Sequence, residues 1–255
     1  MIKDVEILVA AHKDYWMPSD DVYLPIHVGA EGKPALKFVG DNTGDNISIK
    51  NPNYCELTGI YWYWKNKKAN YVGLCHYRRY FSKNNLLKKD KKNLILGKNG
   101  YLSLLEKYDC IVPVKRNYYI ETVRSHYEHA HQKKDLDTLK DVIDEFYPSY
   151  SDAFETVMNR KKLHLLNMFV MKWDLFDSYC TFMFDVLDKV ESRIDISNYS
   201  VQEARVFGYL SERLFNVWLE SNHINYKEAP VVFLEKVNWV KKINSFLMRK
   251  VGLNK

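Results

Sequence analysis

The chain has 255 residues, 46% of them hydrophobic and 15% aromatic, which supplies ample surface for a packed core and excludes a disordered protein. The net charge is +6, and the four cysteines lie far apart with no CxxC pair, so we expect reduced thiols in a cytoplasmic protein. Because we find no secretory signal and no apolar run of about 18–20 residues, we expect the protein to be soluble or peripheral at the inner face of the plasma membrane.

Two segments carry much of the positive charge. Residues 83–98 hold six lysines against one acid, and the residues after Glu235 hold six basic side chains and no acid. We therefore predict one domain over residues 1–235 and a basic amphipathic tail over residues 236–255, helical at 238–251. Such segments suit an anionic membrane surface. Nucleic acid is not favoured as a partner, because the aromatic and basic residues do not interleave in one surface motif.

The first half of the chain predicts strands around one helix. Residues 5–12 form a buried strand, and residues 20–51 form a loop with one short strand near 36–39. A helix over residues 54–65 is capped by Asn53, with Glu56 at its third position. Buried strands follow at 71–75 and 108–113.

The second half is mostly helical. The patterns predict helices at 121–131, 136–146 and 150–158, a strand at 165–171, helices at 174–193 and 202–221, and a last strand at 231–234. Strands interleaved with helices indicate an α/β fold, with a mixed, mostly parallel central sheet and added C-terminal helices.

The clearest candidate for a binding site is His76-Tyr-Arg-Arg-Tyr-Phe81, which follows the strand at 71–75. Ligands of open α/β sheets bind outside the carboxyl ends of the strands. Guanidinium groups there can grip phosphate with two hydrogen bonds each. Arg78 and Arg79 therefore predict an anionic ligand, a nucleotide diphosphate. Alternatively, the pair bridges acidic side chains on neighbouring helices.

We find no Asp-x-Asp motif after a strand to hold a metal ion at a diphosphate. Asp135-Leu-Asp137 matches the motif in sequence but follows a helical, histidine-rich stretch and no strand. Cationic side chains can replace the metal, because the leaving group requires neutralisation of its charge. We therefore expect no metal ligands and no cofactor, and a divalent ion is not favoured.

Residues 40–58 form a second candidate. Asp41, Asn46, Lys50, Asn51 and Glu56 lie before or within the first turn of the predicted helix, whose N-terminus favours anions. They can contact a base, a ribose or a phosphate. Alternatively, the Asn and Asp residues are simply turn formers.

Three histidines and two further polar residues complete the candidates. His126 and His129 share a helix face and could serve a metal, an acceptor or only solvent. His164 and Asn167 interrupt an apolar run, as a hydrogen-bonded core pair or as contacts to sugar hydroxyls. Glu212 lies between apolar neighbours with Arg205 at helical spacing, and is the candidate general base.

Several motifs together resemble one family of bacterial proteins. They are Ile-Ser-Ile-Lys-Asn-Pro-Asn-Tyr-Cys-Glu-Leu-Thr-Gly-Ile-Tyr-Trp (47–62), His-Tyr-Arg-Arg-Tyr-Phe (76–81), Ser-His-Tyr-Glu-His-Ala-His (125–131), Asn-Met-Phe (167–169) and Gly-Tyr-Leu-Ser-Glu-Arg-Leu-Phe (208–215). The family comprises capsular and exopolysaccharide glycosyltransferases long filed as a domain of unknown function, some of them galactofuranosyltransferases. The likeness covers about residues 4–225 and leaves out the basic tail.

The resemblance implies a GT-A-like fold and transfer of a hexosyl group, such as galactofuranosyl, from a UDP-sugar to a lipid-linked or oligosaccharide acceptor. It implies a role in capsular polysaccharide, exopolysaccharide or O-antigen synthesis. It places Ala11, His12, Lys13, Asp41 and Asn46 at the nucleotide, His76, Arg78 and Arg79 at the diphosphate, and His126, His129, His164 and Asn167 at the donor sugar or acceptor. Tyr77 is a further candidate contact to the nucleotide-sugar. The alternative is a non-catalytic nucleotide-sugar or glycan-binding module of a polysaccharide assembly complex.

Overall fold

The computed structural model describes residues 3–83 and 90–235, which contain a nine-stranded sheet. Its main path runs in the order β10 (Tyr226–Ala229), β6 (Cys110–Pro113), β9 (Phe169–Lys172), β4 (Ala69–His76), β1 (Lys3–Ala11), β2 (Tyr23–His27) and β3 (Val39–Gly40). Off this path, β5 (Arg79–Phe81) pairs with β4, and β11 (Val231–Phe233) pairs with β5. Since only β9 and β5 run against the other strands of this sheet, it is mixed but mostly parallel.

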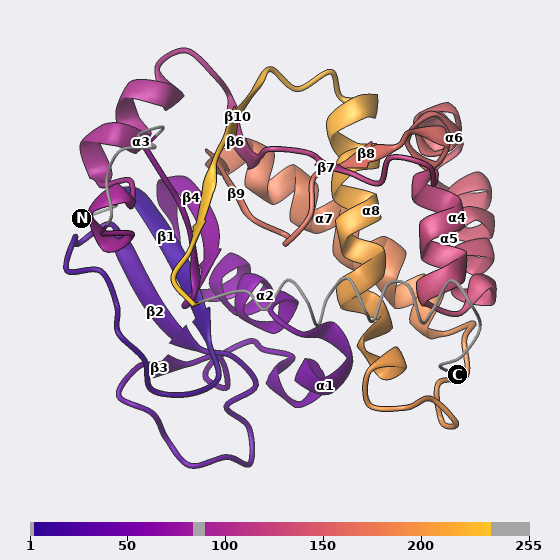
Figure 1. The fold of residues 1–255 in the computed structure, drawn as a ribbon. Helices are drawn as coiled ribbons and strands as arrows, with labels where there is room; N and C mark the ends of the chain where they lie inside the picture. Colours follow the sequence, from indigo (N-terminus) through magenta and orange to yellow (C-terminus); the bar gives the residue numbers. More distant parts are fainter. Residues whose placement is uncertain (1–2, 84–89, 236–255) are drawn as a thin grey trace.

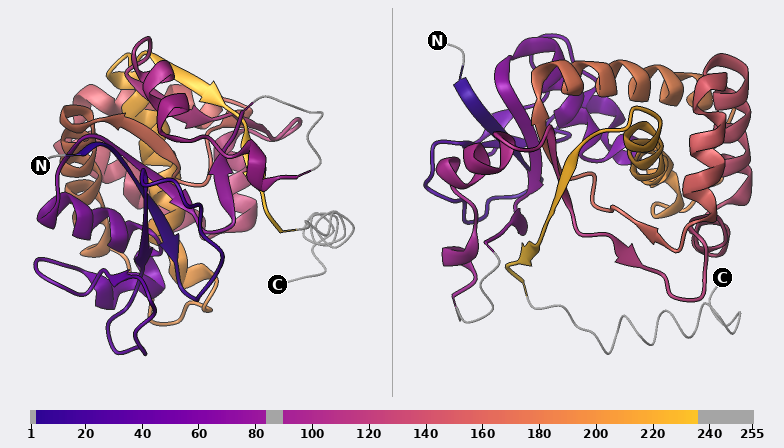
Figure 2. Two further views of the ribbon diagram at one scale, coloured as in Figure 1. Left: turned by 90° about the vertical axis from the view of Figure 1, so that its left-hand side faces the viewer. Right: turned by 90° about the horizontal axis from the view of Figure 1, so that it is seen from above.

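Helices cover the sheet in layers (Figure 1). They are α1 (Asn51–Tyr54), α2 (Leu57–Asn66), α3 (Lys98–Leu105), α4 (Val123–Ala130), α5 (Lys133–Phe146), α6 (Ser151–Asn159), α7 (Trp173–Glu191) and α8 (Val206–Ser221). Helices α4–α6 lie on the opposite side of α8 from the sheet (Figure 2). A separate ribbon of β7 (Arg116–Asn117) and β8 (Lys162–Leu163) lies near them.

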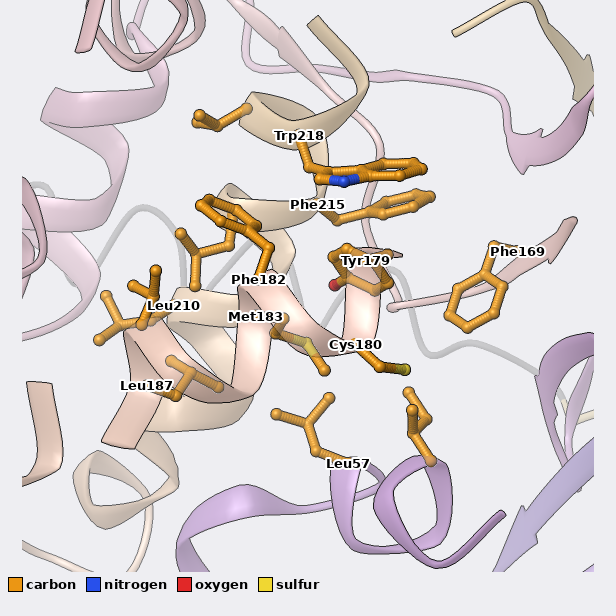
Figure 3. Close-up of a cluster of buried hydrophobic side chains, with 14 of the residues drawn as sticks. Leu57, Phe169, Tyr179, Cys180, Phe182, Met183, Leu187, Leu210, Phe215 and Trp218 are labelled. Atoms are coloured by element: carbon orange, nitrogen blue, oxygen red, sulfur yellow. The ribbon is translucent and has the colours of Figure 1, made fainter. Parts of the chain in front are cut away.

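Strand β1 is buried on both faces, as expected for a central parallel strand. Leu8 and Ala10 contact the larger apolar cluster, which also contains side chains of α7 and α8 (Figure 3). Ile7 and Val9 point the other way, into the cluster that includes Tyr101 of α3. This alternation follows the two-residue period of a strand.

Four predicted strands are confirmed: 5–12 is β1, 71–75 is β4, 108–113 is β6 and 231–234 is β11. The short strand predicted near 36–39 begins only at Val39, as β3. Helices α4–α8 confirm the five helices predicted at 121–131, 136–146, 150–158, 174–193 and 202–221. Helix α8 itself starts at Val206, after a 3-10 turn. The strand predicted at 165–171 begins only at Phe169, because Leu166 and Asn167 have left-handed φ values of 80° and 51°. The helix predicted at 238–251 lies outside the described residues.

Two further predictions were wrong. The loop predicted at 20–51 contains strand β2, which pairs with β1. The helix predicted at 54–65 is interrupted at Cys55, whose φ is 54°, so that Asn53 belongs to α1 and does not cap α2. Within the described part of the chain, we find no helix that combines the length and the apolar character needed to span a membrane.

Candidate functional site

A cavity of about 860 Å³ opens at the carboxyl ends of β1, β2 and β4. From the sheet side it is lined by His12, Val28 and the turn that joins β4 to β5. From the helical side it is lined by α1, by α8 and by parts of residues 199–205. Figure 1 shows α8 facing the strand ends across α1 and α2. The position agrees with the general location of ligand sites in open α/β sheets.

The two arginines of the candidate motif differ in their partners. Strand β4 ends at His76, and a two-residue turn reverses the chain so that Arg79 opens β5 opposite His76. Arg78 forms an ion pair with Glu235 (Nη1–Oε2 2.6 Å), whereas Arg79 has no carboxylate within ion-pair distance among the described residues. Its guanidinium lies 5.7 Å from the centre of the Phe233 ring. Arg79 is thus the cation of this pair that is available to an anion.

The lining of the cavity contains more cations than carboxylates. Lys33 and Arg205 line it together with the arginine pair. Burial, and then the charge of Arg78, lowers the pKa of Arg79. Burial, followed by the charges of Arg78, Lys13 and Lys33, also lowers the pKa of His12. A bound anion would offset the cost of gathering these cations.

Two carboxylates, Glu56 and Glu212, line the same cavity. Glu212 accepts a hydrogen bond from the backbone N–H of Leu166 (2.7 Å) through Oε1 and contacts Arg213 Nη1 (3.0 Å) through Oε2. Burial raises the pKa of Glu212. Glu56 accepts a hydrogen bond from Asn167 Nδ2 (2.9 Å) on Oε1.

Helix α8 packs directly against the break between α1 and α2. A Cβ atom added at Gly208 would lie 3.1 Å from Cys55 Sγ, so glycine permits this close approach. Arg205 Nε donates to the same sulfur at 3.2 Å, and burial raises the pKa of the Cys55 thiol to about 11. Cys55 therefore serves as a neutral contact between α8 and the α1–α2 break.

Most of the residues predicted for the nucleotide-sugar and for catalysis lie together. Those that line the cavity are His12, Asn51, Glu56, His76, Tyr77, Arg78, Arg79 and Glu212. Ala11 is buried at the end of β1, and the ammonium of Lys13 lies 5.7 Å from the Tyr77 ring centre. Asn167 is joined to the cavity by its hydrogen bond to Glu56. Their roles toward a ligand stay predictions.

Asp41, Asn46 and Lys50 do not line the cavity but support the loops beside it. Asp41 is fully buried and accepts hydrogen bonds from the N–H groups of Gly29 (2.8 Å) and Ala30 (3.0 Å). Asn46 accepts one from the N–H of Ser48, and Lys50 pairs with Glu191 (2.6 Å). Asp41 thereby fixes the loop after β2 that carries Val28 and Lys33.

The predicted histidines of the acceptor face also lie outside the cavity lining. The His126 ring stacks on Tyr118 (4.0 Å between centres), and His129 pairs with Glu121 (Nδ1–Oε1 2.9 Å). Across the described ranges, no three His, Cys, Asp or Glu side chains are grouped so as to hold a metal ion. In Asp135-Leu-Asp137, Asp135 instead accepts a hydrogen bond from Tyr199.

His164 is a core residue, 2% exposed, whose Nδ1–H donates to the carbonyl of Pro113 (2.6 Å). Burial lowers its pKa from 6.5 to about 4. The unfolded chain takes up this proton near pH 6.5 and the folded chain only near pH 4. The free energy of unfolding should therefore fall by on the order of 3 kcal/mol as the pH drops through that window.

Urea denaturation from about pH 7 to about pH 4 measures this loss. The variant His164→Gln should lose less stability over that range than the wild-type chain. His223→Gln is the matched control at an exposed histidine and should keep the wild-type slope. An unchanged slope in His164→Gln would contradict the assignment.

Sequence reasoning missed several residues of the cavity. Tyr209 lies one helical turn before Glu212 and shares its face, so the spacing could have indicated it. Lys33, Cys55 and Tyr199 carry no comparable local signal. The loop around Tyr199 reaches the cavity through contacts with α1, such as the bond from Asn53 Nδ2 to the carbonyl of Ala204 (2.8 Å).

The fold is similar to that of a solved structure described as the apo structure of WbbM, a bifunctional glycosyltransferase. The TM-score is 0.86 and the sequence identity 32%, over 92% of this chain and 46% of that chain. This chain thus spans about half the length of WbbM, and its mixed, mostly parallel sheet with flanking helices is a GT-A-like glycosyltransferase fold.

A comparison with curated proteins gave no match. The model of one protein family, described as a domain of unknown function (DUF4422), matches residues 6–223. On this evidence the chain belongs to the DUF4422 family, and its described fold is that of a glycosyltransferase-related protein.

Proposed function

We propose that this chain is a glycosyltransferase that transfers a hexosyl group from a UDP-sugar to a glycan acceptor. One observation carries the proposal: a cavity at the carboxyl ends of β1, β2 and β4 that gathers Lys33, Arg78, Arg79 and Arg205 around two carboxylates. Cationic side chains can bind the negatively charged diphosphate of the donor. A carboxylate can act as the general base that removes the proton of the acceptor hydroxyl. The likeness to WbbM supports the same activity class.

In the proposed reaction the cations take the place that a divalent ion has in other nucleotide-sugar enzymes. As the bond between the anomeric carbon and the diphosphate breaks, negative charge develops on the departing UDP. Arg79, which pairs with no carboxylate among the described residues, meets that charge, and Arg78 assists after exchanging Glu235 for phosphate.

Release of UDP from a panel of UDP-hexoses, including UDP-galactofuranose, tests the proposal. We expect turnover of at least one donor and a rate that changes less than about twofold on addition of EDTA, because side chains supply the neutralising charge. Complete inhibition by EDTA would contradict the cationic site. Stabilisation by UDP-hexoses in thermal unfolding without any turnover would instead indicate a non-catalytic binding module.

The finer parts of the proposal come from the sequence. A galactofuranosyl donor, a lipid-linked acceptor and a role in surface polysaccharide synthesis rest on the family resemblance. Association of the basic residues 236–255 with an anionic membrane also stays a prediction, since these residues lie outside the described ranges.

A further inference from the structure

Strained backbone is concentrated beside Glu56. Cys55, the residue before it, has φ 54°, and Asn167, its hydrogen-bond partner, has φ 51° and follows Leu166 with φ 80°. None of these residues is a glycine. Asparagine adopts this conformation more readily than most residues, but at Cys55 and Leu166 it costs on the order of 1–3 kcal/mol. Strain of this kind persists where the surrounding structure holds a side chain in a required position. Here two segments that are distant in the sequence are both strained at the same carboxylate.

The strain at Cys55 presents Glu56 to the cavity. It ends α1 at Tyr54 and lets α2 begin at Leu57, so that Glu56 lies in the break between two helices. A continuous helix would have given Glu56 a different direction. The side chain is half-buried and lines the cavity.

Asn167 fixes one oxygen of Glu56 and leaves the other available. It is 4% exposed, and its Nδ2 donates to Glu56 Oε1 (2.9 Å) and to the carbonyl of Gly208 (3.2 Å). Its Oδ1 lies 3.1 Å from Ser211 Oγ, which holds the amide in this orientation. Glu56 Oε2 accepts no hydrogen bond from the described residues. It can therefore accept one from a hydroxyl group in the cavity.

Glu212 is engaged differently. Both of its oxygens have partners, the Leu166 N–H and Arg213, and Arg213 is only 2% exposed. By holding the Leu166 N–H, Glu212 fixes the left-handed pair that presents Asn167. The same turn receives a hydrogen bond from His76, whose Nε2–H donates to the Leu166 carbonyl (2.7 Å). Glu212 is thus placed to position the turn.

We propose that Glu56 is the general base of the transfer reaction, and that Asn167 and Glu212 are positioning residues. This inference rests on the proposed function. Glu56 Oε2 takes the proton of the acceptor hydroxyl as the hydroxyl oxygen forms a bond with the anomeric carbon of the donor. The bond from that carbon to the diphosphate breaks, and its electron pair leaves with UDP toward Arg79. This single displacement inverts the anomeric configuration.

The test compares UDP release by the wild-type chain and by Glu56→Gln, which keeps the side-chain size and an oxygen for Asn167. We expect kcat to fall about 10²–10⁴-fold in this variant. The stabilisation of the fold by UDP, measured by thermal unfolding, should stay unchanged. Glu106→Gln on the exposed end of α3 is the matched control and should keep the wild-type kcat.

Azide separates loss of a base from loss of structure. It attacks an anomeric carbon without needing deprotonation, so it should restore UDP release in Glu56→Ala. It should not restore release in Arg79→Ala, where the departing UDP lacks its partner. For the positioning role, Asn167→Ala should lower kcat about tenfold with KM for the UDP-hexose unchanged, since only the orientation of Glu56 is lost.

The outcomes separate this inference from the proposed function. No turnover of any UDP-hexose by the wild-type chain overturns both. Wild-type turnover that Glu56→Gln retains, or that azide fails to restore in Glu56→Ala, overturns the role of Glu56 alone. A hexosyl adduct on Glu56 in mass spectrometry, or a product of retained configuration, would make Glu56 a nucleophile and also overturn the base.

Discussion

Replacing Arg79 by alanine is expected to lower kcat for UDP release from a UDP-hexose about 10³-fold, because the guanidinium stabilises charge that develops on the diphosphate. Burial and the neighbouring Arg78 lower the pKa of Arg79, which means that its positive charge is destabilised in the site without a ligand. The measurement is steady-state UDP release together with UDP binding. Most of the loss should fall in kcat, since the interaction strengthens as the bond breaks.

Three further variants sharpen this prediction. Arg78→Ala should cost less than Arg79→Ala, because Glu235 already pairs with Arg78 and competes with phosphate. Arg79→Lys keeps the charge but not the two-pronged geometry, so its kcat should lie between those of the wild type and Arg79→Ala. Arg160→Ala removes a partly exposed ion pair with Glu220 and should leave kcat unchanged. Equal losses at Arg78 and Arg79 would argue against the assignment.

The position of the two arginines at the cavity was predictable because its signal is local. The apolar run of β4 and the basic residues that follow it are contiguous, and the end of a parallel strand is where an α/β fold binds its ligands. The difference between Arg78 and Arg79 was not predictable. It depends on β11, which pairs with β5 and brings Glu235 to Arg78 from the far end of the described chain.

The pairing of Glu56 with Asn167 shows what sequence patterns do not contain. The two residues are 111 positions apart, and the left-handed conformations that bring them together fall on cysteine and leucine as well as on Asn167. Glycine or asparagine in a sequence can indicate a left-handed backbone conformation, whereas a cysteine such as Cys55 or a leucine such as Leu166 does not. A helical pattern therefore predicted a continuous helix over 54–65, whereas the chain breaks at Cys55, the residue against which α8 packs closely.

Asp41 illustrates the opposite case. As a residue of a Gly- and Asn-rich stretch, it was open to both a binding and a turn-forming interpretation. The structure buries it completely, and it accepts hydrogen bonds from the N–H groups of Gly29 and Ala30, which lie 12 and 11 positions earlier in the chain, so it joins two loops and forms no local turn with these bonds. The polar character of a loop does not distinguish these roles, because both require the same side chains.

Arg213→Met should lower the free energy of unfolding by about 3–5 kcal/mol, the largest stability effect that we expect at the site. Arg213 is 2% exposed, pairs with Glu212 and donates to the Tyr209 carbonyl (2.9 Å). Methionine keeps the unbranched apolar stem but leaves the carboxylate of Glu212 without its cation. Urea denaturation followed by tryptophan fluorescence measures the loss, and Arg193→Met, at a partly exposed pair with Glu145, should cost less than about 1 kcal/mol.

The pH dependence of this loss identifies its cause. Burial already raises the pKa of Glu212, and removal of Arg213 removes the main influence that lowers it. Protonated Glu212 needs no cation. The loss of unfolding free energy in Arg213→Met should therefore be largest at neutral pH and shrink as the pH falls through the raised pKa of Glu212. The double variant Glu212→Gln/Arg213→Met should recover part of the stability at neutral pH, because no buried charge is then left unpaired. A deficit that is independent of pH and unrelieved in the double variant would show that Arg213 acts through packing on Tyr127, whose ring centre lies 4.9 Å from its guanidinium.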